Sequence, residues 1–315
     1  MSQLQLFLFG RFRLQCDAEP WPRLEGQKVQ ELLCYLLVHR EQFHCREKLA
    51  AILWENSSEA QAKQYLRRTL WQLQSAINPG AQQELNLIVV DDDWLQINAA
   101  ANSWCDVAQF EDAFRAAEGT RGRDLDEETA RGLQAAAQLY QGDLLENWYQ
   151  DWCIVARERL QNMFLMALDK LMSYCEIHGS YEQGIQFGVQ ILRCDVGRER
   201  TYRRLMRLHY LAGDRTGALH RYERCAAVLR EEFALEPGRL TAAVYERIKA
   251  DQPLPGTVHA SSMITPGGAP SSLSDLLQYL EAVQASLTRA QRQVTKDIER
   301  IRANLSFGSD SKNTP

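Results

Sequence analysis

The chain has 315 residues, of which 45% are hydrophobic, 9% aromatic and 24% charged, and its formal net charge is −5. This composition is typical of globular proteins, and the length allows two domains of about 100–200 residues each. No apolar run approaches the roughly 18–20 residues that a membrane helix needs, and arginines interrupt the apolar N-terminus, which argues against a signal peptide.

The sequence contains no sign of catalysis or of a metal site. It lacks the phosphate-binding G-x-x-x-x-G-K-[ST] loop, a G-x-G-x-x-G motif after a strand, G-x-S-x-G and H-E-x-x-H. The six histidines do not stand at metal-binding spacing, and no two of the eight cysteines form a C-x-x-C pair. We therefore expect a protein that is not an enzyme, has no cofactor or metal, and keeps its thiols reduced in the cytoplasm.

The first hundred residues predict a small sheet followed by three helices and a hairpin. A hairpin over 4–15, with Gly10-Arg11 as its turn, and a short strand near Trp21 precede helices over 27–39, 46–54 and 59–77. Ser58 is expected to cap the third helix, and Asn78-Pro79-Gly80 to end it. Strands over 85–90 and 94–97 then flank Asp91–Asp93. This order is typical of a winged helix-turn-helix with an additional N-terminal sheet.

Residues 106–250 read as helical almost throughout, which makes the chain mainly α. The predicted helices span 106–117, 126–140, 149–178, 181–193, 198–212, 215–233 and 237–250. A shift of 34 residues aligns Gly179 with Gly213, Gly184 with Ala218, Ile185 with Leu219, and Gly188 with Tyr222. Thirty-four is the tetratricopeptide period, so we expect a tetratricopeptide-like domain, with a plain helical bundle as the alternative.

The C-terminal part differs in composition. Residues 251–271 are rich in proline, glycine and serine and read as a flexible linker, and residues 306–315 read as a disordered tail. Between them, 272–305 show a heptad seam that predicts a coiled-coil helix with self-association, or alternatively an amphipathic helix docked on the main body. The predicted contact residues are Leu277, Leu280, Gln284, Leu287, Gln291, Val294, Ile298 and Ile301.

The third helix, 59–77, is the strongest candidate for a functional surface. One face carries the apolar residues Ala62, Leu66, Leu70, Leu73 and Ile77 and is expected to be buried. The remaining faces carry Gln61, Lys63, Gln64, Arg67, Arg68, Trp71, Gln74 and Ser75. Arginine and glutamine match guanine and adenine edges in the major groove, and lysine neutralises phosphate. The alternative is a merely solvated face. The triply acidic Asp91–Asp93 tip opposes DNA contact at that point, so contact by the flanks of the hairpin is expected.

These segments resemble a known family. LFLFGRFRL, the run from Lys28 to Leu37, REKLAAILW (46–54), YLRRTLWQLQSAI (65–77) and DVAQFEDA (106–113) resemble the OmpR-like winged-helix region of SARP-type (antibiotic regulatory protein) bacterial activators. Residues 139–160, 203–233 and 236–248 are similar to the bacterial transcriptional activator domain. The matches follow the family's order over about 240 residues.

The resemblance implies a transcriptional activator that binds tandem promoter repeats in double-stranded DNA. It places Lys63, Gln64, Arg67 and Arg68 in the recognition helix, Arg46 and Lys48 near the phosphate backbone, and Trp94 in the wing. It also implies that the loop from Glu55 to Ser58 lies near RNA polymerase. Trp71 joins the predicted DNA-binding residues because it shares the outward face of the helix.

Together, the sequence predicts an OmpR-like winged helix-turn-helix domain over 1–104, a bacterial transcriptional activator domain over 105–250, a linker, a coiled coil and a tail. We expect a cytoplasmic, nucleoid-associated regulator without membrane contact that forms a homodimer or higher homo-oligomer. A helical-repeat scaffold whose winged domain binds protein is the alternative. DNA binding would weaken steeply with salt, and peptide binding less so.

Overall fold

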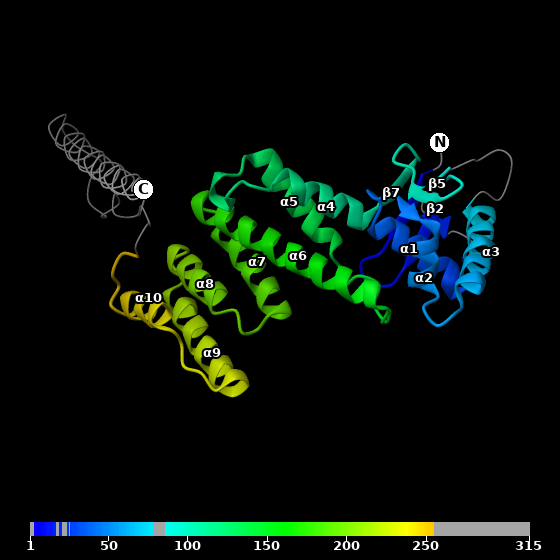
Figure 1. The fold of residues 1–315 in the computed structure, drawn as a ribbon. Coiled ribbons are helices and arrows are strands. Elements are labelled where there is room, and N and C mark those ends of the chain that lie inside the picture. Colours follow the sequence, from blue (N-terminus) through cyan, green and yellow to red (C-terminus); the bar gives the residue numbers. More distant parts are fainter. Residues whose placement is uncertain (1–2, 17–18, 21–23, 25, 78–85, 255–315) are drawn as a thin grey trace, which may run out of the picture. The chain divides into compact units, whose positions relative to one another are not determined.

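The computed structural model describes residues 3–16, 19–20, 24, 26–77 and 86–254. The predicted coiled coil and tail, most of the linker, Trp21 and Asn78-Pro79-Gly80 lie outside these residues. The chain divides into two units, Met1–Leu254 and Pro255–Pro315, and all described contacts belong to the first (Figure 1).

The N-terminal sheet is built around a buried strand. In β1 (Leu4–Phe7), Leu4 and Leu6 alternate inward, and β2 (Arg13–Cys16) pairs antiparallel to it as the predicted hairpin. β3 (Glu19–Pro20) extends one edge, and β7 (Ser103–Cys105) adds to the other edge parallel to β1. β7 was not predicted from the sequence, because three residues are too few to show an alternating pattern.

Three helices and a hairpin follow, as predicted. α1 (Gln27–Val38) is largely buried, and α2 (Arg46–Leu53) and α3 (Glu59–Ile77) pack against it. β5 (Ile88–Val90) and β6 (Trp94–Ile97) form the wing hairpin. The short β4 (His44–Cys45), which the sequence analysis did not predict, pairs with β6 and fixes the wing beside the start of α2. This arrangement is a winged helix-turn-helix.

Ser58 caps α3 as expected. Its Oγ accepts a hydrogen bond from the Gln61 N–H at 3.5 Å, while Gln61 Oε1 accepts from the Ser58 N–H at 3.4 Å. This reciprocal pair is a capping box, which satisfies amide groups that have no partner within the helix. The start of α3 is therefore set by local side-chain chemistry.

The second half of the described unit is helical. Each helix agrees with its predicted range to within two residues: α4 (Asp106–Ala116), α5 (Glu127–Leu139), α6 (Asp151–Ile177), α7 (Tyr181–Cys194), α8 (Glu199–Leu211), α9 (Arg215–Phe233) and α10 (Arg239–Lys249). A 3-10 turn, η1 (Gly122–Asp124), precedes α5. None of the described helices is both long and apolar enough to cross a membrane.

The 34-residue period is visible in the helix boundaries. α6 and α8 end at Ile177 and Leu211, while α7 and α9 begin at Tyr181 and Arg215. The glycines between them, Gly179 and Gly213, share a positive φ of 74° and 80°. Within α7, a Cβ built on Gly188 would lie 2.6 Å from Cδ2 of Leu205 in α8. The small residue thus permits a close approach of α7 and α8.

The helical half is joined tightly to the N-terminal sheet. Asp106, at the start of α4, is buried and accepts hydrogen bonds from the backbone N–H groups of Leu8 and Phe9, at 2.9 Å each. Burial raises the pKa of this carboxyl above its ordinary value, although these hydrogen bonds act against the shift. The segment before α6 also bonds to the sheet, through Gly10 N to Asp143 O and Leu145 N to Leu8 O.

Candidate nucleic-acid interface

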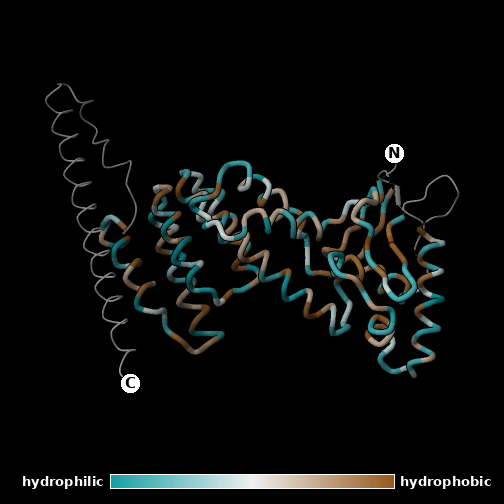
Figure 2. Tube along the Cα trace, turned by 45° about the horizontal axis from the view of Figure 1, so that its top comes forward, coloured by the Kyte–Doolittle hydropathy of each residue, from teal (hydrophilic) through white to brown (hydrophobic). Residues whose placement is uncertain are grey.

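The outward face of α3 carries a continuous exposed stripe. Gln64, Arg67, Arg68 and Trp71, here called the α3 stripe, are all exposed, and Trp71 is 68% exposed. Their spacing of three, four and seven residues places them on one helix face. Figure 2 shows hydrophilic residues along much of α3, in contrast to the hydrophobic β1. As predicted, the opposite face is buried and consists of Ala62, Leu66, Leu70, Leu73 and Ile77.

The two arginines of the stripe have no partner within the described part of the chain. Neither Arg67 nor Arg68 forms an ion pair or hydrogen bond with any residue that the structure describes. A guanidinium carries five N–H donors in a planar arrangement that matches guanine O6 and N7. In the free protein these donors are satisfied by water. The stripe can therefore donate to a base edge or a phosphate without breaking a bond in the fold.

Lys63 is on the same helix but in a different electrostatic setting. Its Nζ lies 2.7 Å from a carboxylate oxygen of Glu47 in α2 and 2.7 Å from one of Glu59. These two carboxylates raise the pKa of Lys63 above its ordinary value. The ammonium is thus charged but compensated, and it connects α2 to α3. The ion pair between Lys63 and Glu47 was not predictable from the sequence, because the two residues are 16 positions apart.

Arg46 and Lys48 lie in the first turn of α2, next to the wing. Arg46 Nη1 donates to the backbone oxygen of Asp92 at 3.0 Å, and its backbone N–H donates to Asp93 O at 2.9 Å. One cation therefore lies beside the acidic tip, where it offsets part of the negative charge. Lys48 is exposed.

Trp94 occupies the flank of the wing. It stands opposite Cys45 in the β4–β6 pairing and is 46% exposed, while Leu95 and Ile97 of the same strand point inward. Val89 and Val90 expose further apolar surface on β5. Asp91–Asp93 are all exposed at the tip. The structure thus brings Arg46, Trp94 and the wing together, and the predicted oligomerisation residues from Leu277 to Ile301 lie outside the described part.

No metal-binding cluster of three or more His, Cys, Asp or Glu side chains occurs among residues 3–16, 26–77 and 86–254. All eight cysteines are free thiols. One buried ionic network was not predicted from the sequence. Glu111 of α4 accepts from Arg40, after α1, and lies 2.6 Å from Arg159 of α6. It joins the winged region to the helical half.

Comparison with known proteins identifies one domain of the chain and two similar regulators. Residues 105–249 match the model of the bacterial transcriptional activator domain. The chain is 22% identical over 252 residues to the transcriptional regulatory protein MoaR1 of Mycobacterium bovis (strain BCG / Pasteur 1173P2) and of Mycobacterium tuberculosis (strain ATCC 25618 / H37Rv). The match covers 80% of this chain and 81% of each relative.

A solved structure shows the same fold. Mycobacterium tuberculosis EmbR, in complex with a low-affinity phosphopeptide, aligns with a TM-score of 0.62 and 22% identity. The alignment covers 81% of this chain and 67% of that one. These comparisons agree with the resemblance found in the sequence: the chain carries a bacterial transcriptional activator domain over 105–249 and is similar to transcriptional regulators.

Proposed function

We propose that this regulator is a sequence-specific DNA-binding activator that reads promoter repeats with the α3 stripe. The observation that supports this most is the exposed, unpaired arginine pair, Arg67 and Arg68, on the second helix of a helix-turn-helix. That helix enters the major groove in such motifs, and α3 is long enough to cross it.

The other predicted residues supplement this contact. Lys48, and Arg46 beside the wing, are suited to phosphate, and Trp94 to the sugar–phosphate edge beside the hairpin. Lys63 contributes to DNA binding in one of two ways. Its ammonium leaves Glu47 and Glu59 and binds a phosphate, or it stays paired and reduces the repulsion between these two carboxylates and the phosphates. The acidic tip, Asp91–Asp93, faces away from DNA in this proposal because like charges repel.

The assembly follows from the same proposal. Residues 1–104 bind DNA, 105–250 pack on that domain, and the loop from Glu55 to Ser58 contacts RNA polymerase. Residues 251–271 act as a linker, and 272–305 form a homodimer or higher homo-oligomer that engages paired sites through a raised effective concentration. The protein acts in the cytoplasm on the nucleoid and has no enzymatic role.

The first experiment is a selection of host-genome fragments with the purified full-length chain at low salt. We expect enrichment of a short repeated sequence. Binding to that sequence should weaken steeply with salt, because phosphate counterions return. Absence of enrichment by a folded protein, or weak salt dependence, would favour the protein-binding scaffold instead, to which the acidic wing tip is suited.

The decisive variant is Arg67→Ala with Arg68→Ala, measured by fluorescence anisotropy on the selected site. Since a base or phosphate contact contributes about 1–3 kcal/mol, affinity should fall at least about 30-fold, and the salt slope by about 2. The control, Arg121→Ala with Arg131→Ala, removes the same charge from exposed positions on other elements. Unchanged affinity with intact helicity would contradict the recognition-helix assignment.

A further inference from the structure

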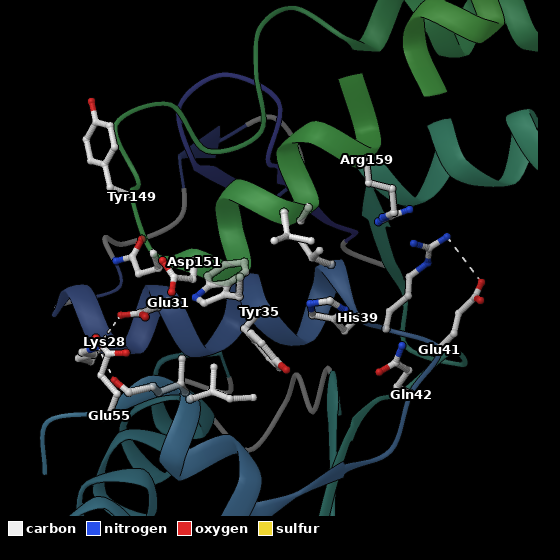
Figure 3. A pocket seen from close by; sticks show the side chains of 18 of the residues that line it. Lys28, Glu31, Tyr35, His39, Glu41, Gln42, Glu55, Tyr149, Asp151 and Arg159 are labelled. Atoms are coloured by element: carbon white, nitrogen blue, oxygen red, sulfur yellow. Dashed lines mark hydrogen bonds and ion pairs between the residues drawn. The ribbon is translucent and has the colours of Figure 1, made fainter. Parts of the chain in front are cut away.

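A cleft of about 1530 Å³ runs along α1, on a surface separate from the α3 stripe. Its walls come from α1, the end of α2 with the loop after it, α4, and the beginning of α6 (Figure 3). No residue of the α3 stripe lines it. Because the walls belong to both the winged region and the helical half, an occupant would contact both.

The size of the cleft indicates a polypeptide occupant. Small-molecule sites measure about 300–1,000 Å³ and bury most of their ligand. This cleft is larger and follows α1, whose 12 residues span about 18 Å at 1.5 Å per residue. That length equals about three turns of a second helix. A helix laid into such a groove can use apolar anchors on its walls.

The rim supplies those anchors. Ile52 of α2 is 43% exposed, Val155 of α6 is 67% exposed, and Tyr149, just before α6, is 75% exposed. The three side chains come from opposite walls of one cleft, and the rings of Trp54 and Trp152 line its interior. Exposed apolar groups gathered in this way mark a binding surface more often than scattered ones do.

The charges of the cleft are unequal. Its cations are paired: Lys28 with Glu31 at 2.8 Å, Arg40 and Arg159 with Glu111, and Arg115 with Glu41. Three lining carboxylates, those of Glu55, Glu118 and Asp151, form no ion pair within the described part of the chain. Figure 3 shows Glu31, Glu55 and Asp151 gathered with Lys28 at one end. The unpaired charge in the cleft is therefore negative.

We propose that this cleft binds a basic amphipathic helix of a protein partner. Lysine or arginine side chains of that helix would lie against Glu55 and Asp151, and its apolar face against Ile52, Val155 and Trp152. Opposite charges steer such an encounter, and the desolvated apolar contacts hold it. The site is independent of DNA binding, because the two surfaces share no residue.

The probe is a fluorescein-labelled 14-residue leucine–lysine peptide that folds as an amphipathic helix, titrated with the full-length protein. We expect saturable binding, and no binding of the matching leucine–glutamate peptide. Glu55→Lys and Val155→Lys should each weaken binding at least about tenfold, since each places in the cleft a cation that repels the lysines of the peptide. Asp151→Asn should weaken it less, because only one charge is removed.

Two matched controls lie outside the cleft. Glu128→Lys reverses an exposed acid on α5, and Met166→Lys places a cation at an exposed apolar position of α6. Both should bind the peptide within twofold of the unaltered protein. The proposal is overturned if the controls weaken binding as much as Glu55→Lys and Val155→Lys, if the leucine–glutamate peptide binds equally, or if the folded protein binds neither peptide.

Discussion

Two helices of this protein carry adjacent arginines, and they use them differently. α3 has Arg67 and Arg68, and α8 has Arg203 and Arg204. In α8, Arg204 lies 2.7 Å from Asp169 and donates to Ser173 Oγ at 2.7 Å, while Arg207 lies 2.8 Å from Glu176. All three partners belong to α6. The α3 pair has no such partner among the described residues.

The difference depends on neighbouring helices rather than on arginine itself. Carboxylates of α6 lie within reach of Arg204 and Arg207 of α8. None of the described carboxylates pairs with Arg67 or Arg68 on the outward face of α3, so these two arginines stay solvated. A paired, part-buried cation stabilises the fold, because its removal leaves an acid uncompensated. An exposed, unpaired cation adds little to stability and is available to a ligand.

The largest effect in this comparison is expected for Arg204→Ala. Because the substitution leaves Asp169 without its closest partner in a part-buried site, the free energy of unfolding should fall by about 2 kcal/mol. Urea denaturation measures this, and DNA affinity should stay within twofold. Reduced DNA affinity with unchanged stability would mean that α8, too, provides ligand contacts.

Gly188→Ala tests the packing that holds the α8 arginines in place. The added Cβ would meet Leu205 and Met172 at 2.6–2.8 Å, so overpacking should lower the free energy of unfolding by about 1–3 kcal/mol. In the control, Gly132→Ala, the new Cβ has open space within a helix, and stability should rise by about 0.5–1 kcal/mol. Two changes of the same sign would contradict this account of the close approach.

Ser58→Ala tests whether the Ser58–Gln61 cap fixes the start of α3. Loss of the cap should lower the free energy of unfolding by about 1 kcal/mol, measured by thermal unfolding. Ser75→Ala, on the exposed surface of the same helix, should change it by less than about 0.5 kcal/mol. If the two variants behave alike, the start of α3 is held by tertiary packing instead of by the Ser58–Gln61 pair.

The smallest effect concerns Lys63. Glu47→Gln removes one of its two carboxylate partners and one negative charge beside the α3 stripe. DNA affinity should rise about threefold at low salt, and the gain should disappear at high salt as charges are screened. Glu127→Gln on α5 is the control and should leave affinity unchanged. An equal gain from both variants would show only the effect of net charge.

Long periodic segments of the fold were predictable from the sequence, and short pairings were not. Helices such as α3 and α9 were located because apolar residues repeat over several turns and local caps mark their ends. β4 and β7 have two and three residues, and their partners β6 and β1 lie far away in the chain. Strand pairings of that kind depend on the assembled sheet, so no local sequence pattern predicts them.

The candidate site divides in the same way. The buried face of α3 fixes which side is exposed, so its helical period was enough to identify Arg67, Arg68 and Trp71. The partners of Lys63 and Arg46 could not be predicted from the sequence, because Glu47 and Asp92 come close to them only after α2, α3 and the wing have packed. The cleft along α1 is formed with α6, more than a hundred residues later, and left no signal in sequence.

The hydrogen bonds that Asp106 accepts from Leu8 and Phe9 have a consequence for how this protein can be divided. The strand at 103–105 pairs with β1, and the segment at 143–146 bonds to residues 8–10 just after β1. A fragment ending at residue 104 keeps β2 and most of β7, but it lacks the Asp106 carboxylate and the backbone groups at 143–146 that hold residues 8–10. Residues 3–254 should melt in one cooperative transition, and a stable fragment of the winged region for crystallisation or display has to extend past 146.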